Sequence, residues 1–176
     1  MKTILDKEQL QSAIEQLADQ LQQNHADLAN VVFVGIQQGG VVLADDIVTC
    51  LQQINPTQKI QYGQLDITFY RDDVRKSLHI ANATDIPFSI ENKKVILIDD
   101  VLYTGRTIRA AMDAMLAYGR PKSVDLMVLV DRVHNRELPV EASIVGIAVD
   151  TIQSQKVSVE LRESGGNDAV FLLNEG

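Results

Sequence analysis

Two neighbouring carboxylates, Asp99 and Asp100, are the residues of this sequence best suited to chemistry. They follow four consecutive apolar residues, Val95–Ile98, a run that is typical of a buried parallel strand. Open α/β sheets bind their ligands at the carboxyl ends of such strands. A pair of carboxylates at that edge can accept hydrogen bonds from ribose hydroxyls or bind a divalent cation.

The residues that follow the carboxylates suit a phosphate group. A short turn leads to Thr104–Thr107, in which two threonines, a glycine and an arginine begin a predicted helix. A helix N-terminus presents free backbone N–H groups to an anion. The two features together could hold a sugar 5-phosphate at one end and its vicinal diol at the other. Strands that end in Asp and helices capped by Thr also occur without a ligand, so a purely structural role stays open at this point.

Two other classes of phosphate-handling protein do not fit the sequence. A Walker A loop is excluded because the chain has no Gly-x-x-x-x-Gly-Lys. The paired aspartates of receiver domains follow the first strand, whereas Asp99 and Asp100 lie in the middle of the chain.

Length and composition predict a cytoplasmic protein with a single domain over residues 1–176. The chain has 176 residues, 45% of them hydrophobic, which is enough for one sizeable core. No apolar run approaches the roughly 20 residues that cross a bilayer, and the first residues lack a signal-peptide pattern, so we expect no membrane partner. Cys50 is the only cysteine, which excludes internal disulfides and favours the cytoplasm.

The net charge of −8 is distributed unevenly along the chain. Residues 1–58 contain seven acidic residues but only two basic ones, Lys2 and Lys7. An acidic surface repels nucleic acid, so this distribution argues against RNA binding. The remaining basic residues lie further along the chain, where an anionic ligand could bind.

The apolar periodicity predicts strands that alternate with helices, and this order implies a doubly wound, mostly parallel sheet. We expect the first helix after an Asp6–Gln9 capping box. The expected helices are 7–23, 41–53 and one that carries Ile108 and Met115 and ends at Gly119–Pro121. The expected strands are 31–36, 95–100, 124–130 and 144–149, with an extended segment at 60–70, a long polar loop at 70–87 and a closing hairpin of 157–161 and 170–173.

The carboxylate pair and the Thr-rich turn resemble the 5-phosphoribosyl-1-pyrophosphate (PRPP) signature of the type I phosphoribosyltransferases. Further segments resemble one branch of that family, the PyrR proteins, with the same order and spacing over nearly the whole chain. These segments are 65–73, 119–121, 128–132 and 136–139. The resemblance implies an α/β fold of the type I phosphoribosyltransferase kind with a small hood. It also implies transfer of the phosphoribosyl group of PRPP to uracil, which gives UMP and pyrophosphate, with Mg²⁺ bound together with PRPP.

The resemblance assigns roles to individual residues. Asp99 and Asp100 would be catalytic and would bind the ribose hydroxyls, directly or through Mg²⁺. The predicted PRPP and phosphate site comprises Asp99, Asp100, Val101, Leu102, Tyr103, Thr104, Gly105, Arg106 and Thr107. The pyrophosphate loop would contain Gln38 and Gly39, and a mobile loop would contain the catalytic Arg71 with Asp72, Asp73, Arg75 and Lys76. The base pocket would be completed by Asp131, Arg132 and His134.

The chain departs from the family pattern at two places in this site. Gly39 stands where the family has an arginine beside the pyrophosphate. Loss of that charged hydrogen bond, worth about 1.5–3 kcal/mol, would slow the reaction roughly 10- to 100-fold if it acts only in the transition state. Val133 stands where PyrR proteins have glycine, and an extra residue separates His134 from Arg136. The longer, stiffer turn calls uracil specificity into question.

Three functions therefore compete at this stage. The first is a uracil phosphoribosyltransferase with reduced or altered activity. The second is an RNA-binding attenuator that senses UMP or UTP, although the segments Leu10–Gln23 and Val41–Gln53, which the resemblance assigns to a basic RNA-binding surface, contain no Lys or Arg. The third is a PRPP or nucleotide sensor that has lost catalysis and acts on a protein partner. A homodimer or higher homo-oligomer is expected for all three.

Overall fold

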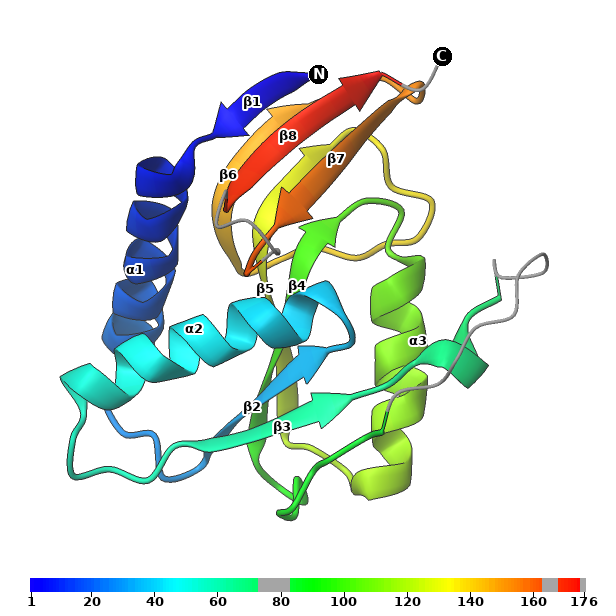
Figure 1. Ribbon diagram of the computed structural model, residues 1–176. Helices are drawn as coiled ribbons and strands as arrows, with labels where there is room; N and C mark the ends of the chain where they lie inside the picture. Colours follow the sequence, from blue (N-terminus) through cyan, green and yellow to red (C-terminus); the bar gives the residue numbers. More distant parts are fainter. Residues whose placement is uncertain (73–82, 163–167, 175–176) are drawn as a thin grey trace.

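The computed structural model describes residues 1–72, 83–162 and 168–174. Its centre is a five-stranded sheet in the order β3-β2-β4-β5-β6, in which all neighbouring strands are parallel (Figure 1). The strands are β2 (Val31–Ile36), β3 (Gln61–Leu65), β4 (Lys94–Leu102), β5 (Ser123–Val133) and β6 (Ile144–Asp150). The predicted α/β class and parallel sheet are confirmed.

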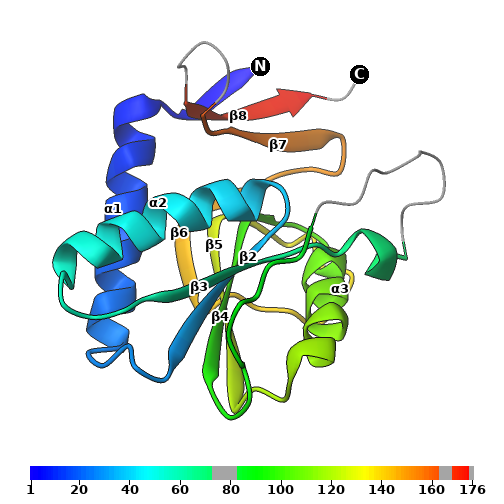
Figure 2. The same cartoon turned by 60° about the horizontal axis from the view of Figure 1, so that its bottom comes forward.

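Helices cover both faces of the sheet, as expected of a doubly wound fold (Figure 2). Helices α1 (Lys7–Asn24) and α2 (Gly39–Ile54) pack on one face, and α3 (Arg106–Met115) packs on the other. Alternate residues of β2 divide between the two cores, with Phe33 in the first and Val34 in the second. Because both faces of each central strand are buried, the strands read as unbroken apolar runs.

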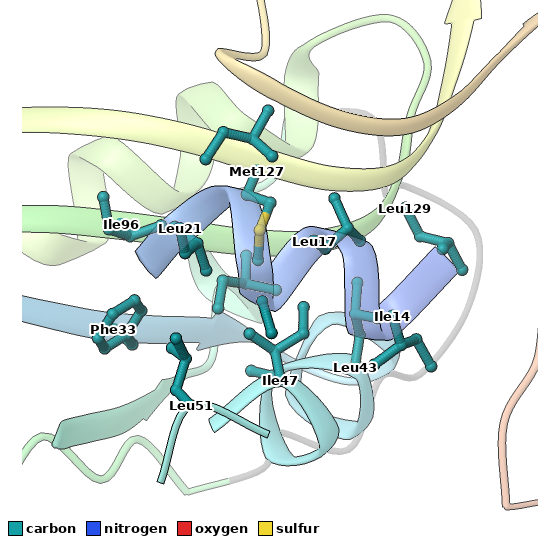
Figure 3. Packing of buried hydrophobic residues seen from close by; sticks show 14 of the residues in the cluster. Ile14, Leu17, Leu21, Phe33, Leu43, Ile47, Leu51, Ile96, Met127 and Leu129 are labelled. Carbon is teal, nitrogen blue, oxygen red and sulfur yellow. The ribbon is translucent and has the colours of Figure 1, made fainter. Parts of the chain in front are cut away.

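The first core joins α1 and α2 to the sheet. Leu17 and Leu21 of α1 lie between Ile47 of α2 and Met127 of β5, and Phe33 of β2 belongs to the same cluster (Figure 3). All five side chains are fully buried. The apolar spacing of the first helix therefore marks the core-facing side, and the acidic residues of α1 remain exposed.

The start of α1 follows the predicted capping box. The Asp6 side chain accepts a hydrogen bond from the Gln9 N–H at 2.9 Å, and the Gln9 side chain accepts one from the Asp6 N–H at 3.0 Å. Two N–H groups that have no partner within the helix are satisfied in this way.

Of the helices in the described ranges, none is long and apolar enough to cross a membrane.

A second, three-stranded antiparallel sheet forms the hood, in the order β1-β8-β7. Its strands are β1 (Lys2–Leu5), β7 (Gln155–Glu160) and β8 (Ala169–Asn174). Figure 1 shows the hood beyond the carboxyl ends of β4 and β5. The predicted closing hairpin is confirmed, although its turn at 164–167 lies outside the described residues. The sequence analysis missed β1, a four-residue strand whose only signal would have been its partner at the other end of the chain.

The central strand is longer than predicted. It was expected to end in Asp99 and Asp100, but β4 continues two residues beyond them to Leu102. Asp99 and Val101 remain paired with β5, opposite Val128 and Val130. This pairing with a neighbour overrides the low strand propensity of aspartate.

Helix α2 begins two residues earlier than predicted. Gly39 and Gly40 form its first turn, and a Cβ at position 40 would overlap the carbonyl oxygen of Ile98 and lie 3.0 Å from the Asp99 Cα. Glycine is poor in helix interiors, which is why the sequence suggested a turn here. Its lack of a side chain lets the helix start pack directly on the end of β4.

The segment predicted to be extended over 60–70 changes conformation halfway. Strand β3 ends at Leu65, and the Asp66 carboxylate then accepts hydrogen bonds from the N–H and hydroxyl of Thr68 at 2.9 and 2.6 Å. This Asx turn starts a short 3₁₀ helix, η1 (Thr68–Tyr70). A second 3₁₀ helix, η2 (Leu116–Tyr118), follows α3. Most of the predicted polar loop, residues 73–82, lies outside the described residues.

Candidate active site

The two carboxylates lie where β4 meets α2. Asp99 is buried, with 6% of its surface exposed, whereas Asp100 is half-buried. The Asp100 N–H donates to the Asp99 carboxylate at 3.0 Å, and the Val101 N–H donates to the Asp100 carboxylate at 2.8 Å. The Asp100 side chain lies against Gly39, because a Cβ at that position would overlap its carboxylate. The strand end and the predicted pyrophosphate loop are therefore in direct contact.

Burial changes the acidity of Asp99. Loss of solvent is the main cause, with the neighbouring charge of Asp100 second, and together they raise the pKa of Asp99 well above its ordinary value. The positive charge of Arg71 opposes this rise. Shifted carboxyl pKa values at a strand end are typical of ligand-binding and catalytic sites.

The loop after β4 has the geometry of an anion-binding turn. Gly105 precedes α3 with a φ of +92°, a conformation that strains residues with a side chain. The hydroxyl of Thr104 accepts a hydrogen bond from the Arg106 N–H at 3.3 Å. The carbonyl of Thr104 accepts from the N–H groups of Glu137 and Leu138 at 3.0 and 3.1 Å. The β5–β6 connection thus holds the loop in place from behind.

A cavity of about 660 Å³ opens over this loop. Arg71 reaches into it and donates to the Thr107 hydroxyl at 3.2 Å. The lining residues are Arg71, Asp72, Val101, Leu102, Tyr103, Thr104, Gly105, Arg106, Thr107, Ile108 and Glu137. The structure therefore brings together the predicted residues 101–107 with the first two residues of the predicted mobile loop. The other three, Asp73, Arg75 and Lys76, lie outside the described residues.

The charged groups around this cavity are paired with one another. Asp72 accepts hydrogen bonds from Arg106 and Arg109, each at 3.0 Å, and Arg106 also donates to Glu137 at 2.6 Å. Asp72 and Glu137 therefore neutralise much of the positive charge of Arg106 and Arg109 at this cavity. The sequence analysis did not assign Arg109 or Glu137 to the site, although Glu137 belongs to a segment that matched the family.

Gln38 and Gly39 line a second cavity of about 300 Å³. Asp100 of β4 and Val42 of α2 line one side of it, and Val159 and Leu161 line it from the hood. The peptide bond before Gln38 is cis. The predicted pyrophosphate loop, the second carboxylate and the hood therefore meet at one place.

The three predicted base-pocket residues do not line either cavity. Asp131 forms an ion pair with Arg136, whose guanidinium also donates to the carbonyl of Tyr103 at 2.7 Å. Arg132 is buried, and its guanidinium lies 3.8 Å from the centre of the Tyr103 ring. His134 is exposed in a turn with a φ of +66°. Arg136, which the sequence analysis did not assign, joins this group to the loop after β4.

Comparison with known proteins gives consistent results. The family model "Phosphoribosyl transferase domain" matches residues 1–164. The chain is 44% identical to Bifunctional protein PyrR of Roseiflexus sp. over 98% of this chain and 94% of that protein. It is 43% identical to Bifunctional protein PyrR of Bacillus subtilis over 96% of this chain and 94% of that protein.

Solved structures show the same fold at lower sequence identity. A hypoxanthine phosphoribosyltransferase from Trypanosoma cruzi superposes with a TM-score of 0.75 at 16% identity, covering 99% of this chain and 95% of that one. One from Staphylococcus aureus gives a TM-score of 0.67 at 23% identity, covering 85% and 77%. At these identities the likeness concerns the fold alone.

The raised pKa of Asp99 predicts an unusual dependence of stability on pH. The folded chain holds this proton more tightly than the unfolded chain, so Asp99 costs stability increasingly as the pH rises above about 3.9, the unfolded value. We expect Asp99→Asn to raise the melting temperature of the unliganded protein near pH 8, by about 2–4 °C for each kcal/mol gained, and to change it least near pH 4. Thermal unfolding across this range measures the effect.

The matched control for this prediction is Asp150→Asn, which neutralises an exposed carboxylate at the end of β6. It should leave the pH profile unchanged. An Asp99→Asn variant that is less stable than wild type at every pH would contradict the assigned cause.

Proposed function

The chain belongs to the phosphoribosyl transferase domain family, and on this premise we propose that it transfers the phosphoribosyl group of PRPP to uracil. The products would be UMP and pyrophosphate. One observation carries the proposal: the carboxylate pair at the end of β4 and the start of α3 lie on one short continuous segment, residues 99–107. That segment can bind both ends of a ribose 5-phosphate.

The proposed binding mode uses each part of the site once. The backbone N–H groups at the start of α3 and the hydroxyls of Thr104 and Thr107 bind the 5-phosphate. Asp99 and Asp100 accept hydrogen bonds from the ribose hydroxyls. Gly39, which lies against Asp100, and Gln38, which lines the same cavity, then face the pyrophosphate. The order of these groups follows the order of the groups along PRPP.

We expect Mg²⁺ to enter this site together with PRPP. Across the described ranges, no cluster of three or more His, Cys, Asp or Glu residues could hold a metal by itself. Asp100 is half-buried and so would be accessible to an ion that arrives with PRPP. Held by Asp100 together with PRPP, Mg²⁺ would supply positive charge to stabilise the departing pyrophosphate.

The chemistry then needs no covalent nucleophile from the protein. A ring nitrogen of uracil displaces pyrophosphate at the anomeric carbon through an oxocarbenium-like transition state. Asp99 and Asp100 orient the ribose, and the N–H dipoles of the loop fix the phosphate, so that the reacting carbon has a defined position. Arg71, which donates to the Thr107 hydroxyl and lines the same cavity, adds positive charge beside the bound phosphoribosyl group in this proposal.

Further parts of the proposal concern the setting of the enzyme. We place it in the cytoplasm, in keeping with its single cysteine, as a single domain over residues 1–176. Homo-oligomerisation and a base pocket at Asp131, Arg132 and His134 stay predictions. Because the relatives are named bifunctional, RNA-dependent regulation is the second candidate function, with UMP or UTP as the sensed ligand.

We expect Asp100→Asn to weaken binding of Mg-PRPP by about 10- to 100-fold, because it removes a charged acceptor worth about 1.5–3 kcal/mol. Calorimetry with PRPP and Mg²⁺ measures the affinity, and a radiolabelled-uracil assay measures turnover. Asp19→Asn, an exposed change on α1, is the control and should bind as wild type does. Equal affinities in Asp100→Asn and wild type would reject the site. PRPP binding without turnover of uracil would instead favour the nucleotide sensor.

Substitutions of Gly39 test whether the missing positive charge in the predicted pyrophosphate loop limits the reaction. Any side chain there must displace the Asp100 carboxylate, so Gly39→Ala should lower kcat/KM. Gly39→Arg causes the same displacement but adds a cation beside the pyrophosphate. We expect its kcat/KM to exceed that of Gly39→Ala by roughly 10- to 100-fold, and to exceed that of wild type. Equal rates for the two variants in the uracil assay would show that the charge is not the limiting defect.

The charge distribution predicts that the chain does not bind a pyrimidine-operon leader RNA. RNA binding needs cations that neutralise phosphates, and the exposed sides of α1 and α2 present carboxylates such as Glu15 and Asp19. A fluorescence titration at about 150 mM salt should show no sequence-dependent binding. Submicromolar affinity for the leader over a scrambled RNA would overturn this prediction and favour the RNA-binding attenuator.

A further inference from the structure

The connection between β6 and β7, residues 151–154, leads the chain from the central sheet into the hood. It is held by a buried arginine of the neighbouring strand. Arg132 has 4% of its surface exposed, and its guanidinium donates to the Thr151 hydroxyl at 2.9 Å. It also donates to the carbonyls of Gln155 at 2.8 Å and Ile152 at 3.4 Å. A single side chain at the end of β5 thus binds two residues of the connection and the first residue of β7.

The extra residue of the β5–β6 turn, Asn135, binds the same connection from the other side. Its amide donates to the carbonyl of Val133 at 2.8 Å and to the carbonyl of Thr151 at 2.9 Å. A longer contact reaches the Thr151 hydroxyl at 3.4 Å. Thr151 is itself buried, with 6% exposed. Asn135 and Arg132 therefore converge on one buried residue at the entrance to the hood.

The far face of Arg132 connects this arrangement to the phosphate-binding loop. Its guanidinium stacks on the ring of Tyr103 at 3.8 Å, and Tyr103 lines the proposed phosphate cavity.

In the connection to the hood, Ile152 is 65% exposed although it is a large apolar residue. Its backbone is fixed in a turn, since its N–H donates to the Gln155 side chain at 3.1 Å. A planar base has an apolar face that such a side chain can cover.

We propose that Arg132, Asn135 and Thr151 form a hood strut, and that Asn135 is a positioning residue for the base. The inference rests on the proposed function, in which the β4 loop holds the phosphate and ribose. With that end of the substrate fixed, the room left for the base depends on where the hood stands relative to the loop. The strut joins these two parts through buried hydrogen bonds and a stacked guanidinium. Asn135 acts through Thr151 and does not touch the reacting atoms.

The test compares two substitutions that remove the same donor. Asn135→Ala deletes the amide, and Asn135→Asp keeps its shape but leaves a group that cannot donate to the carbonyls of Val133 and Thr151. Both should raise KM for uracil by about tenfold, the effect of losing one or two buried hydrogen bonds. KM for PRPP should stay within about twofold of wild type. Glu141→Ala, an exposed change in the same β5–β6 connection, is the control.

A second readout does not depend on activity. Hydrogen–deuterium exchange of the amides of residues 151–156 should become faster in both Asn135 variants, while the amides of β4 and α3 keep their protection. A merely structural role would raise both KM values together and lower protection throughout the sheet, which would overturn the proposal. Unchanged exchange at 151–156 would also overturn it. Failure of wild type to use uracil would reject the proposed function, and the exchange experiment would still decide the strut.

Discussion

The pairing of β4 with β5 as far as Leu102 is the constraint on which the site depends. It carries two adjacent carboxylates into the edge of a buried sheet, where water no longer solvates Asp99. The raised pKa of Asp99 and the contact between Asp100 and Gly39 both follow from this position. A fold that ended the strand at Ile98 would leave both carboxylates in solvent, where a ligand would have to order them first.

Charge is arranged around the phosphate cavity so that anion binding does not rely on one strong cation. Arg106 is shared between Asp72 and Glu137. Paired arginines fix the position of the loop and of the segment that enters it, while the helix N-terminus supplies the N–H donors. In the proposed binding mode, this division separates the groups that hold the loop in place from those that bind the ligand.

The hood is attached to the rest of the molecule by polar contacts as well as by its core. Besides the hood strut, Arg162 forms ion pairs with Asp45 and Asp46 of α2. These ion pairs are exposed, and an exposed ion pair contributes little to stability. The guanidinium of Arg132 is buried and hydrogen-bonded, and leaving such a group unpaired is costly. The position of the hood over the second cavity therefore depends more on Arg132 than on Arg162.

The sequence by itself determined the parts of this protein that local patterns encode. Unbroken apolar runs predicted the parallel sheet, helical spacing and the Asp6 cap predicted α1, and the Asp-Asp and Thr-Gly-Arg-Thr motifs indicated the candidate phosphate site. Each of these signals lies within about a dozen residues, the range over which periodicity and capping act.

Only the tertiary structure decided the contacts between distant segments. Strand β1 needs β8, the early start of α2 needs the backbone of β4, and the role of Asn135 needs Thr151. The burial of Arg132 could likewise not be predicted from the sequence, because the residue type alone does not tell whether an arginine is buried in the fold or exposed. These features depend on packing and hydrogen bonding across the fold, which override local propensity.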